Sequence, residues 1–262
     1  MPELPDLTVF AENLHRRLAG GRITAVHRHG SGGRLNVSPA ELSRALSGAT
    51  IERVERAGKE LCFRIGNGRL LYIHLMLNGG FRLAAQPLQR SAGDAIISID
   101  FEQGVCLSLH DPKGLATVSL DPPRDQGVPD ALDVDAGLLK RLIAGKPRTL
   151  IKALLIDQKI IRGIGNAYAD EILWQARISP RSSAGKLPDE AVEALAAAIS
   201  SVLLDAAQQL RKRHPDMIAG EFREFLAVHN PDRRESPGGR SIRVETVSSK
   251  KTYFTDEQVL YS

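Results

Sequence analysis

Hydrophobic residues alternate with a period of about two along the first part of this chain and recur every ~3.6 residues along the second part. The change falls at the proline-rich stretch of residues 121–129. Closely spaced alternating runs predict a β-sandwich or barrel, whereas the longer period predicts amphipathic helices. The pattern therefore predicts an α+β protein of more than one domain, with the proline-rich stretch as a linker.

The expected elements follow from this periodicity and from turn and capping residues. Helices are expected at residues 5–19 and from the capping sequence Ser38-Pro39-Ala40-Glu41 to Ser47. Strands of the first part are expected at residues 22–29, 51–56, 60–65, 69–76, 81–84, 95–101, 105–109 and 116–120. The second part is expected to contain helices at residues 135–144, 149–157, 166–177, 188–213 and 218–228, then strands at residues 242–247 and 252–254 joined by residues 248–251.

The composition is that of a soluble globular protein, with 42% hydrophobic and 25% charged residues. No apolar run reaches the roughly 18 residues of a membrane span, and the N-terminus lacks the basic and apolar segments of a secretory signal. We therefore expect a cytoplasmic protein without a membrane partner. The two cysteines, Cys62 and Cys106, lie in alternating apolar runs and are expected in the core, and nothing requires a disulfide between them.

Positive charge is concentrated in two segments, although the net charge of the chain is only +4. Residues 140–164 contain seven Lys or Arg and a single acidic residue, Asp157, which leaves +6. Residues 233–251 contain six Lys or Arg against Glu235 and Glu245, which leaves +4. A solvated helix face would explain either segment alone, but the two together favour a surface that follows nucleic-acid phosphates.

The N-terminus offers a candidate nucleophile. Removal of Met1 would leave Pro2 with a free secondary amine beside the carboxylate of Glu3. An α-amine titrates near pH ~8, against ~10.4 for lysine, so a useful fraction is uncharged at neutral pH. Such an amine can form a Schiff base with a sugar carbon while Glu3 transfers a proton. The ordinary alternative is that Glu3 only favours the positive end of a following helix.

A second candidate site lies in residues 158–172, where Gly163 and Gly165 separate two expected helices and Asn166 begins the second. Glycines leave backbone N–H groups accessible at a helix N-terminus, so this turn is a candidate site for one DNA phosphate. A helix hairpin turned by glycines is the structural alternative. A dinucleotide-binding turn is set aside, because this turn follows a helix rather than a strand and lacks a third glycine in register.

The run QKIIRGIGNAYADEI at residues 158–172 resembles the helix–two-turn–helix signature of the formamidopyrimidine-DNA glycosylase / endonuclease VIII family of base-excision repair enzymes. The opening MPELPD also resembles that family's N-terminus, which usually ends in Glu rather than Asp. The order of elements matches over essentially the whole chain. The resemblance implies a catalytic β-sandwich with flanking helices at residues 1–125, a helical DNA-binding domain at 130–228 and a C-terminal β-hairpin finger at 229–262.

Carried over by position, Pro2 resembles the Schiff-base nucleophile and Glu3 the general acid. Lys59, in the sequence RAGKEL, resembles the lysine whose ammonium contacts the phosphate beside the lesion and assists protonation during strand cleavage. Asn166 and Lys152 resemble phosphate ligands of the helix–turn motif. The resemblance thus implies a catalytic set of three residues and a separate phosphate grip.

Leu77, in the sequence HLMLNGG, resembles the residue that fills the space left by a flipped base, a position where Met is common. In the sequence DPKGLA, Lys113 and Leu115 stand where the family usually has Arg-Arg-Phe after Asp-Pro, so a planar guanidinium is lost there. Residues 215–228 are short where purine-specific members carry a long loop. This favours ring-opened purines, hydantoins or oxidised pyrimidines over 8-oxoguanine.

The family's usual four-cysteine zinc site would fall near Glu235, Gly238, Thr255 and Gln258, which do not form a zinc ligand set. We therefore expect a zincless finger with no metal and no cofactor. The resemblance implies that Lys250 or Lys251 stands where an arginine usually grips the phosphates around the lesion.

The leading hypothesis is a monomeric, bacterial-type bifunctional DNA glycosylase/AP lyase associated with the nucleoid. It would excise damaged bases from double-stranded DNA through a Schiff base at Pro2 and then nick the abasic strand by β- or β,δ-elimination. The alternative is a catalytically silent protein that binds damaged or structured DNA on the same scaffold. The presence of Pro2, Glu3 and Lys59 favours the enzyme, and the altered void-filling loop and missing zinc ligands favour the binder.

Overall fold

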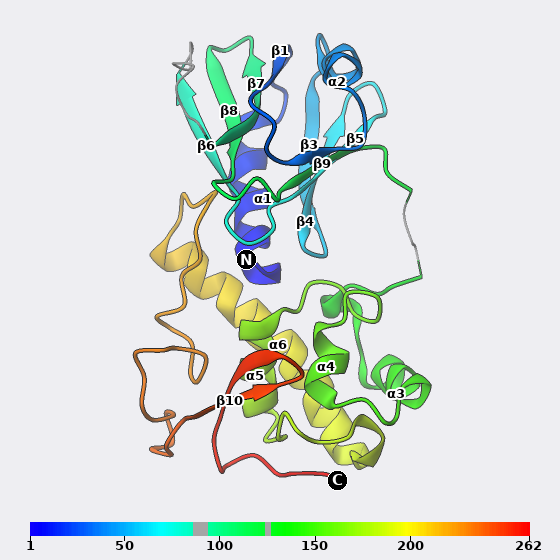
Figure 1. Ribbon diagram of the computed structural model, residues 1–262, viewed down its shortest axis with the longest axis vertical. Coiled ribbons are helices and arrows are strands. Elements are labelled where there is room, and N and C mark those ends of the chain that lie inside the picture. Colours follow the sequence, from blue (N-terminus) through cyan, green and yellow to red (C-terminus); the bar gives the residue numbers. More distant parts are fainter. Residues whose placement is uncertain (86–93, 124–126) are drawn as a thin grey trace. The chain divides into compact units, whose positions relative to one another are not determined.

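The computed structural model describes residues 1–85, 94–123 and 127–262, which form two compact units (Figure 1). The first unit comprises Met1–Pro2, Asp6–Arg124 and Leu210–Glu221. The second comprises Glu3–Pro5, Asp125–Gln209 and Phe222–Ser262. Residues 229–262, expected as a separate finger, therefore lie in the same unit as the helices. The expected linker at residues 121–129 includes residues 124–126, which lie outside the described residues.

The first unit contains two β-sheets, α2 (Pro39–Leu46) and most of α1 (Leu4–Leu18). One sheet has the strand order β1 (Ile23–Arg28), β7 (Ala95–Phe101), β8 (Val105–His110) and β6 (Gly80–Ala85). The other has the order β2 (Arg34–Leu35), β9 (Thr117–Leu120), β5 (Leu70–His74), β4 (Glu60–Ile65) and β3 (Ile51–Ala57). The predicted N-terminal β-sandwich with flanking helices is confirmed. Strand β2 was not predicted, because two residues carry no periodicity.

Apolar side chains from both sheets and from one face of α1 form the core of the first unit. The predicted stripe on α1 is at most 1% exposed at Leu7, Phe10, Leu14 and Leu18. Phe63 of β4 and Phe81 of β6 meet edge to face, with ring centroids 6.2 Å apart, so one aromatic pair joins the two sheets. Cys62 and Cys106 are buried free thiols, as expected for core residues, and burial raises the pKa of Cys106 to about 12.

The second unit is predominantly helical, as predicted. Its helices are α3 (Ala136–Gly145), α4 (Ile151–Ile156), α5 (Asn166–Gln175) and α6 (Asp189–Arg213), the last of which enters the first unit at Leu210. A short 3₁₀ helix, η1 (Ala131–Asp133), precedes α3, and a second, η2 (Ala184–Lys186), lies between α5 and α6. The Asp135 side chain caps α3 by accepting a hydrogen bond from the Leu138 amide at 2.6 Å. None of the helices in the described part of the chain is long and apolar enough to span a membrane.

The prediction of a helix at residues 218–228 is wrong. This segment contains turns and bends instead, and Gly220 has a φ of +87°. The buried carboxylate of Glu171 accepts the backbone N–H groups of Ala227, Val228 and His229 at 2.6–2.8 Å. A side chain distant in sequence thus satisfies three amides that a helix would have used, and the local apolar spacing could not reveal it.

A C-terminal hairpin is formed by β10 (Arg243–Val247) and β11 (Lys250–Phe254), paired antiparallel. The connection is shorter than predicted. Only Ser248 and Ser249 form the turn, with φ values of +50° and +61°, and the two lysines that follow belong to β11. Positive φ at both positions is the geometry of a two-residue hairpin turn, which glycine or asparagine usually occupies.

A buried ion pair joins this hairpin to the helices. The Lys152 ammonium on α4 is fully buried, lies 2.7 Å from Asp170 on α5 and donates to the Thr252 hydroxyl on β11 at 2.6 Å. The other Asp170 oxygen accepts from the Tyr253 amide at 2.9 Å and lies 2.7 Å from His229 Nδ1. We call these five residues the Lys152–Asp170 cluster. It supplies the buried ammonium with a countercharge and an acceptor.

A second polar cluster holds the chain around the positions expected to replace zinc ligands. The Glu257 carboxylate accepts hydrogen bonds from Ser236, Thr255, Trp174 and Arg177 at 2.7–3.1 Å. These contacts, led by Ser236 and Arg177, lower the pKa of Glu257 to about 2. We call this set the Glu257 cluster. It ties both sides of the finger to the end of α5.

The remaining expected zinc positions also have polar partners or no ligand atoms. The Gln258 side chain accepts from the Thr255 amide at 2.9 Å and donates to the Ile178 carbonyl at 2.8 Å. Gly238 has no side chain, and Glu235 forms a backbone bridge with Ser241. Within the described residues, His, Cys, Asp and Glu side chains form no group of three or more that could hold a metal ion.

We predict that Lys152→Met destabilises the second unit by roughly 3–5 kcal/mol, because it leaves the Asp170 carboxylate buried without its countercharge. Thermal unfolding and amide hydrogen exchange of the hairpin measure this effect. Lys186→Met, which removes an exposed lysine of the same unit, serves as the control and should be nearly neutral. An equally stable Lys152→Met protein would show that the pair does not hold the hairpin.

We also predict that Glu257→Gln lowers stability by about 1–3 kcal/mol at neutral pH, because an amide cannot accept from every donor that faces the carboxylate. The pKa of Glu257 falls from 4.5 to about 2 in the folded state. Its contribution is therefore present above pH 4.5 and lost as the pH falls towards 2. Unfolding midpoints between pH 7 and pH 2 should converge for wild type and variant. Asp256→Asn, at the exposed neighbouring residue, should leave the profile unchanged.

Candidate functional site

The predicted nucleophile, Pro2, is buried at the start of the chain. Its nitrogen is part of the Met1–Pro2 peptide bond in the described chain, so its chemistry depends on removal of Met1. The Met1 α-amino group forms an ion pair with the Glu221 carboxylate. The N-terminal amine therefore lies beside an acidic side chain.

The Glu3 carboxylate lies at the N-terminus of α5. It is 4% exposed and accepts the backbone N–H groups of Gly165, Ala167 and Tyr168 at 2.8, 3.0 and 3.3 Å. The Leu4 amide also donates to the Gly163 carbonyl at 3.2 Å. The anion on this helix N-terminus is thus the chain's own carboxylate. This corrects the sequence interpretation, which assigned these amides to a DNA phosphate.

The two glycines of this turn are required by the close approach of the N-terminal segment. A Cβ at Gly165 would lie 2.3 Å from the Glu3 carboxyl carbon, which no real side chain tolerates. Gly163 has a φ of +105°, and a Cβ there would lie 2.7 Å from a Leu4 methyl group. The sequence therefore indicated the right feature, a close approach to the backbone, but not the partner that makes it.

Lys59 lies in the first unit at the tight turn between β3 and β4. It follows Gly58, whose φ is +62°, and its side chain is 8% exposed. The Arg56 guanidinium supports the turn by donating to the Gly58 carbonyl and the Thr8 hydroxyl, each at 3.2 Å. Burial lowers the pKa of His74; the charge of Glu60 opposes this shift, and the charge of Lys59 adds to it.

Lys152 and Asn166, the expected phosphate ligands, both contact other parts of the protein. Lys152 is the fully buried member of the Lys152–Asp170 cluster, and burial lowers its pKa although Asp170 opposes that shift. A direct phosphate contact requires an exposed ammonium, so this geometry makes Lys152 a support for the hairpin. Asn166 donates from Nδ2 to the Lys251 carbonyl at 2.8 Å and links α5 to β11.

Lys250 and Lys251 remain exposed on β11, next to the contacts that fix the hairpin. The Lys251 ammonium lies 5.1 Å from the centroid of the Tyr253 ring, a cation–π distance. Lys250 is close enough to Lys152 for its charge to contribute to lowering the pKa of that buried group. Both lysines present positive charge from a strand whose backbone is anchored by neighbouring side chains.

The expected void-filling loops belong to the first unit. Leu77 is 50% exposed in the turn after β5, where the preceding residue Met76 has a φ of +54°. Lys113 is exposed at the tip of the second loop. The buried Asp111 carboxylate accepts the amides of Lys113, Leu115 and Ala116 at 2.6–3.0 Å, so this loop is fixed from within.

A polar chain supports the base of the second loop. His110 lies 2.8 Å from the Ser108 hydroxyl and 3.0 Å from the Asp94 carboxylate, and the Asp94 carbonyl accepts from the Asp111 amide at 2.9 Å. The hydrogen bond from His110 lowers the pKa of Asp94. Sequence analysis missed the supporting acids, Asp111 here and Asp170, Glu171 and Glu257 in the second unit. Their hydrogen-bond partners lie in other elements of the fold. The only signal in the sequence was an acidic residue among apolar ones.

The comparisons with known proteins cover both units. Residues 1–118 match the model of the formamidopyrimidine-DNA glycosylase N-terminal domain, and residues 129–215 match that of the formamidopyrimidine-DNA glycosylase H2TH domain. A formamidopyrimidine-DNA glycosylase of Methylococcus capsulatus is 30% identical over 271 residues, which cover 97% of this chain and 98% of the relative. One of Geobacter sulfurreducens is 34% identical over 214 residues, 79% of this chain and 78% of the relative.

Solved structures agree with these relatives. The complex between the Lactococcus lactis Fpg and an abasic site containing DNA has a TM-score of 0.85 and 25% identity, with 98% of this chain and 99% of that chain covered. The complex of wild-type Lactococcus lactis Fpg with a N7-benzyl-Fapy-dG containing DNA has a TM-score of 0.85 and 26% identity over the same shares. The chain belongs to the formamidopyrimidine-DNA glycosylase family.

Proposed function

We propose that this protein is a bifunctional DNA glycosylase and AP lyase that acts on oxidised or ring-opened bases in double-stranded DNA. The observation that carries the proposal is the fixation of Glu3 by three amides at the N-terminus of α5. It holds the residue directly after Pro2 in one place, and a nucleophile needs such positioning. The named activity of the relatives and the damaged DNA bound by the solved structures support the same function.

In the proposed reaction, the Pro2 amine, freed by loss of Met1, attacks the sugar C1′ of an extruded nucleotide. A bond forms between the amine nitrogen and C1′, the glycosidic C–N bond breaks, and the base leaves with its electron pair and takes up a proton. Ring opening gives an iminium ion. Loss of a C2′ proton then expels the 3′ phosphate, and a second elimination can release the 5′ phosphate. Glu3 and Lys59 are the proposed proton carriers.

The proposed DNA contacts come from exposed groups of each unit. Lys250 and Lys251 on β11 supply phosphate contacts, and Asn166 keeps that strand on α5. Leu77 fills the space left by the extruded base, and Lys113 faces the opposite strand. Lys152 supports these contacts indirectly, through Thr252. We further propose that the protein acts as a monomer in a bacterial-type cytoplasm and needs no metal.

A catalytically silent DNA-binding protein is the second candidate. The observation that favours it is the altered void-filling loop, where Lys113 and Leu115 stand in place of the usual Arg-Arg-Phe. A chain that keeps Met1 would have no free proline amine and could still bind DNA through its lysines.

We predict that the purified protein, with Met1 removed, forms a covalent adduct with abasic duplex DNA on borohydride reduction, and that peptide mapping places the link at Pro2. A chain with an uncleaved N-terminal extension changes no native residue and should give no adduct. DNA binding without any adduct from the processed chain would favour the silent binder instead.

Lys250→Ala should reduce the slope of log K against log salt by about one unit, because one phosphate contact and its released counterion are lost. Lys186→Ala, at an exposed lysine outside the proposed interface, provides the comparison and should leave the slope unchanged. Titrations of a labelled duplex over a range of salt concentrations measure both slopes. Equal slopes for wild type and Lys250→Ala would remove β11 from the proposed interface.

A further inference from the structure

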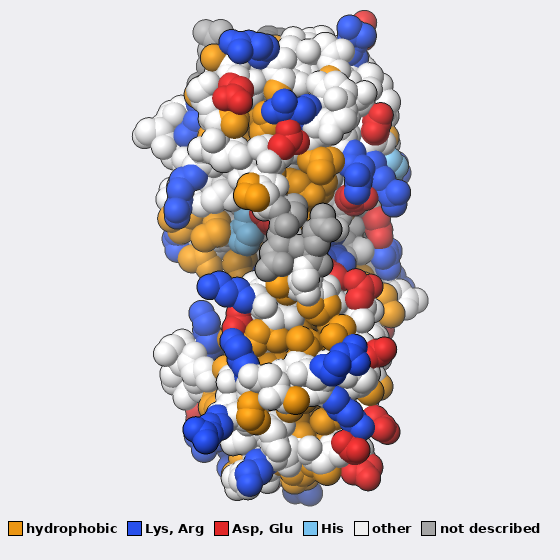
Figure 2. Space-filling model, turned by 90° about the vertical axis from the view of Figure 1, so that its right-hand side faces the viewer, with side chains coloured by type: hydrophobic (Ala, Val, Ile, Leu, Met, Phe, Trp, Pro, Cys, Tyr) orange, Lys and Arg blue, Asp and Glu red, His pale blue; other side chains and the backbone are white. Residues whose placement is uncertain are grey.

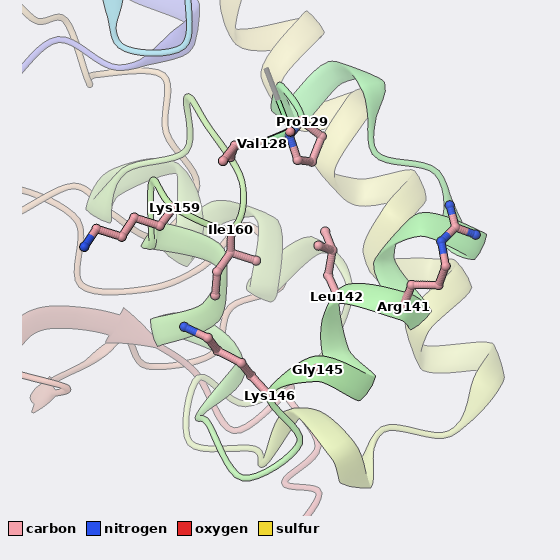
Figure 3. Close-up of a pocket in the computed structure, with 9 residues that line it drawn as sticks. Val128, Pro129, Arg141, Leu142, Gly145, Lys146, Lys159 and Ile160 are labelled. Atoms are coloured by element: carbon pink, nitrogen blue, oxygen red, sulfur yellow. The ribbon is translucent and has the colours of Figure 1, made fainter. Parts of the chain in front are cut away.

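A surface pocket of about 270 Å³ lies at the C-terminal end of α3 in the second unit (Figure 3). It involves neither the proposed catalytic residues nor β11. Its walls come from the segment before η1, from α3 and from the turn after α4. The lining residues are Gly127, Val128, Pro129, Arg141, Leu142, Gly145, Lys146, Lys159 and Ile160.

The pocket combines apolar walls with cations at its edge. Aliphatic side chains of Val128, Leu142 and Ile160 face the hollow, whereas Lys146 and Lys159 extend on one side of it and Arg141 on the other (Figure 3). In the lower part of the face in Figure 2, apolar side chains are likewise exposed between Lys and Arg, and Asp and Glu side chains lie along one edge.

The charge around this pocket is largely uncompensated. Three of its nine lining residues are cationic and none is acidic. The Asp157 carboxylate lies 3.5 Å from the Lys146 ammonium in a half-exposed pair, where water weakens the attraction. Complementing the negative end of the α3 dipole accounts for Lys146, but not for Lys159, which follows α4. The excess charge therefore indicates an acidic ligand.

The aliphatic walls distinguish between two kinds of acidic ligand. Single-stranded nucleic acids are held by aromatic platforms on which bases stack, and no Phe, Tyr or Trp lines this pocket. Duplex phosphates require cations but no apolar hollow. A peptide with acidic residues beside one large apolar side chain matches both features, because the side chain enters the hollow and the carboxylates meet the three cations.

We propose that this pocket is a docking site for a partner protein, which inserts one apolar side chain from an acidic segment. The volume, about 270 Å³, is enough for a single leucine or phenylalanine side chain. None of its lining residues is a proposed catalytic residue or a proposed DNA contact, so such a partner would recruit the protein without replacing its substrate.

The test uses a fluorescein-labelled peptide of four aspartates followed by leucine and phenylalanine, titrated with the full chain and followed by anisotropy. A matched peptide ends in serine and glycine instead. The proposal requires the first peptide to bind about tenfold or more tightly than the second, since only the first carries the apolar anchor. Equal binding of both peptides, or no binding of either, overturns it.

Two variants locate the site. Lys146→Glu and Leu142→Gln should each weaken the first peptide by about tenfold, through charge reversal and loss of apolar contact respectively. Lys186→Glu makes the same charge change at an exposed lysine outside the pocket and should have little effect. If Lys186→Glu weakens the peptide as much as Lys146→Glu does, binding is a response to net charge and the proposal fails.

A DNA titration decides between the two ligand classes. Leu142→Gln should bind a labelled undamaged duplex as tightly as wild type does. Loss of duplex affinity in Leu142→Gln, with no peptide binding in wild type, would assign the pocket to nucleic acid and overturn the proposal. Borohydride trapping by Leu142→Gln should equal that of wild type. Failure of trapping in wild type itself would contradict the proposed enzyme activity and not the docking site.

Discussion

The hydrogen bonds from the N-terminus of α5 to Glu3 are the contact on which the rest of the arrangement depends. They join the beginning of the chain to a turn more than 160 residues later. A buried carboxylate is costly unless donors surround it, and here three amides of one helix end do so. The same three amides thereby have an acceptor. The same set of hydrogen bonds therefore caps the helix and compensates the charge of a buried side chain.

The second unit repeats this solution with other acids. Asp170, Glu171 and Glu257 each draw backbone or side-chain donors from several elements onto one carboxylate. Asp170 holds the hairpin through Lys152 and Thr252, Glu171 holds the irregular segment after α6, and Glu257 holds the chain on both sides of the hairpin. These acids join the hairpin and the segment after α6 to the helices of the second unit.

Much of the fold could be predicted from the sequence, because it rests on local patterns. The stripe of α1, the alternating strands and the Ser38 cap each depend on residues within one element, and the β-sandwich followed by helices is confirmed. The failures share a cause. The segment at 218–228 had helical spacing, yet its amides bond to Glu171, and the short turn at Ser248 and Ser249 required positive φ at residues that rarely adopt it.

The residues of the candidate site could be proposed from the sequence, but the groups that they contact could not. Pro2, Glu3 and Lys59 could be proposed from the first residues and the RAGKEL sequence, and their roles stay predictions. Gly163 and Gly165 correctly indicated a close approach, but a phosphate and a carboxylate make the same demand on a helix N-terminus. Lys152 could not be separated from exposed lysines, because burial of a charge depends on a distant countercharge.

The Glu257 cluster has a consequence for a protein proposed to work where DNA is being oxidised. Zinc-bound thiolates are themselves targets of peroxide, and their oxidation releases the metal. Here the hairpin is held by carboxylate, hydroxyl, indole and guanidinium groups, none of which is a thiol. The two cysteines are buried in the other unit, and the raised pKa of Cys106 keeps its sulfur protonated and poorly reactive. A hairpin held in this way should keep its shape under oxidative conditions, because none of the groups that hold it is a thiol.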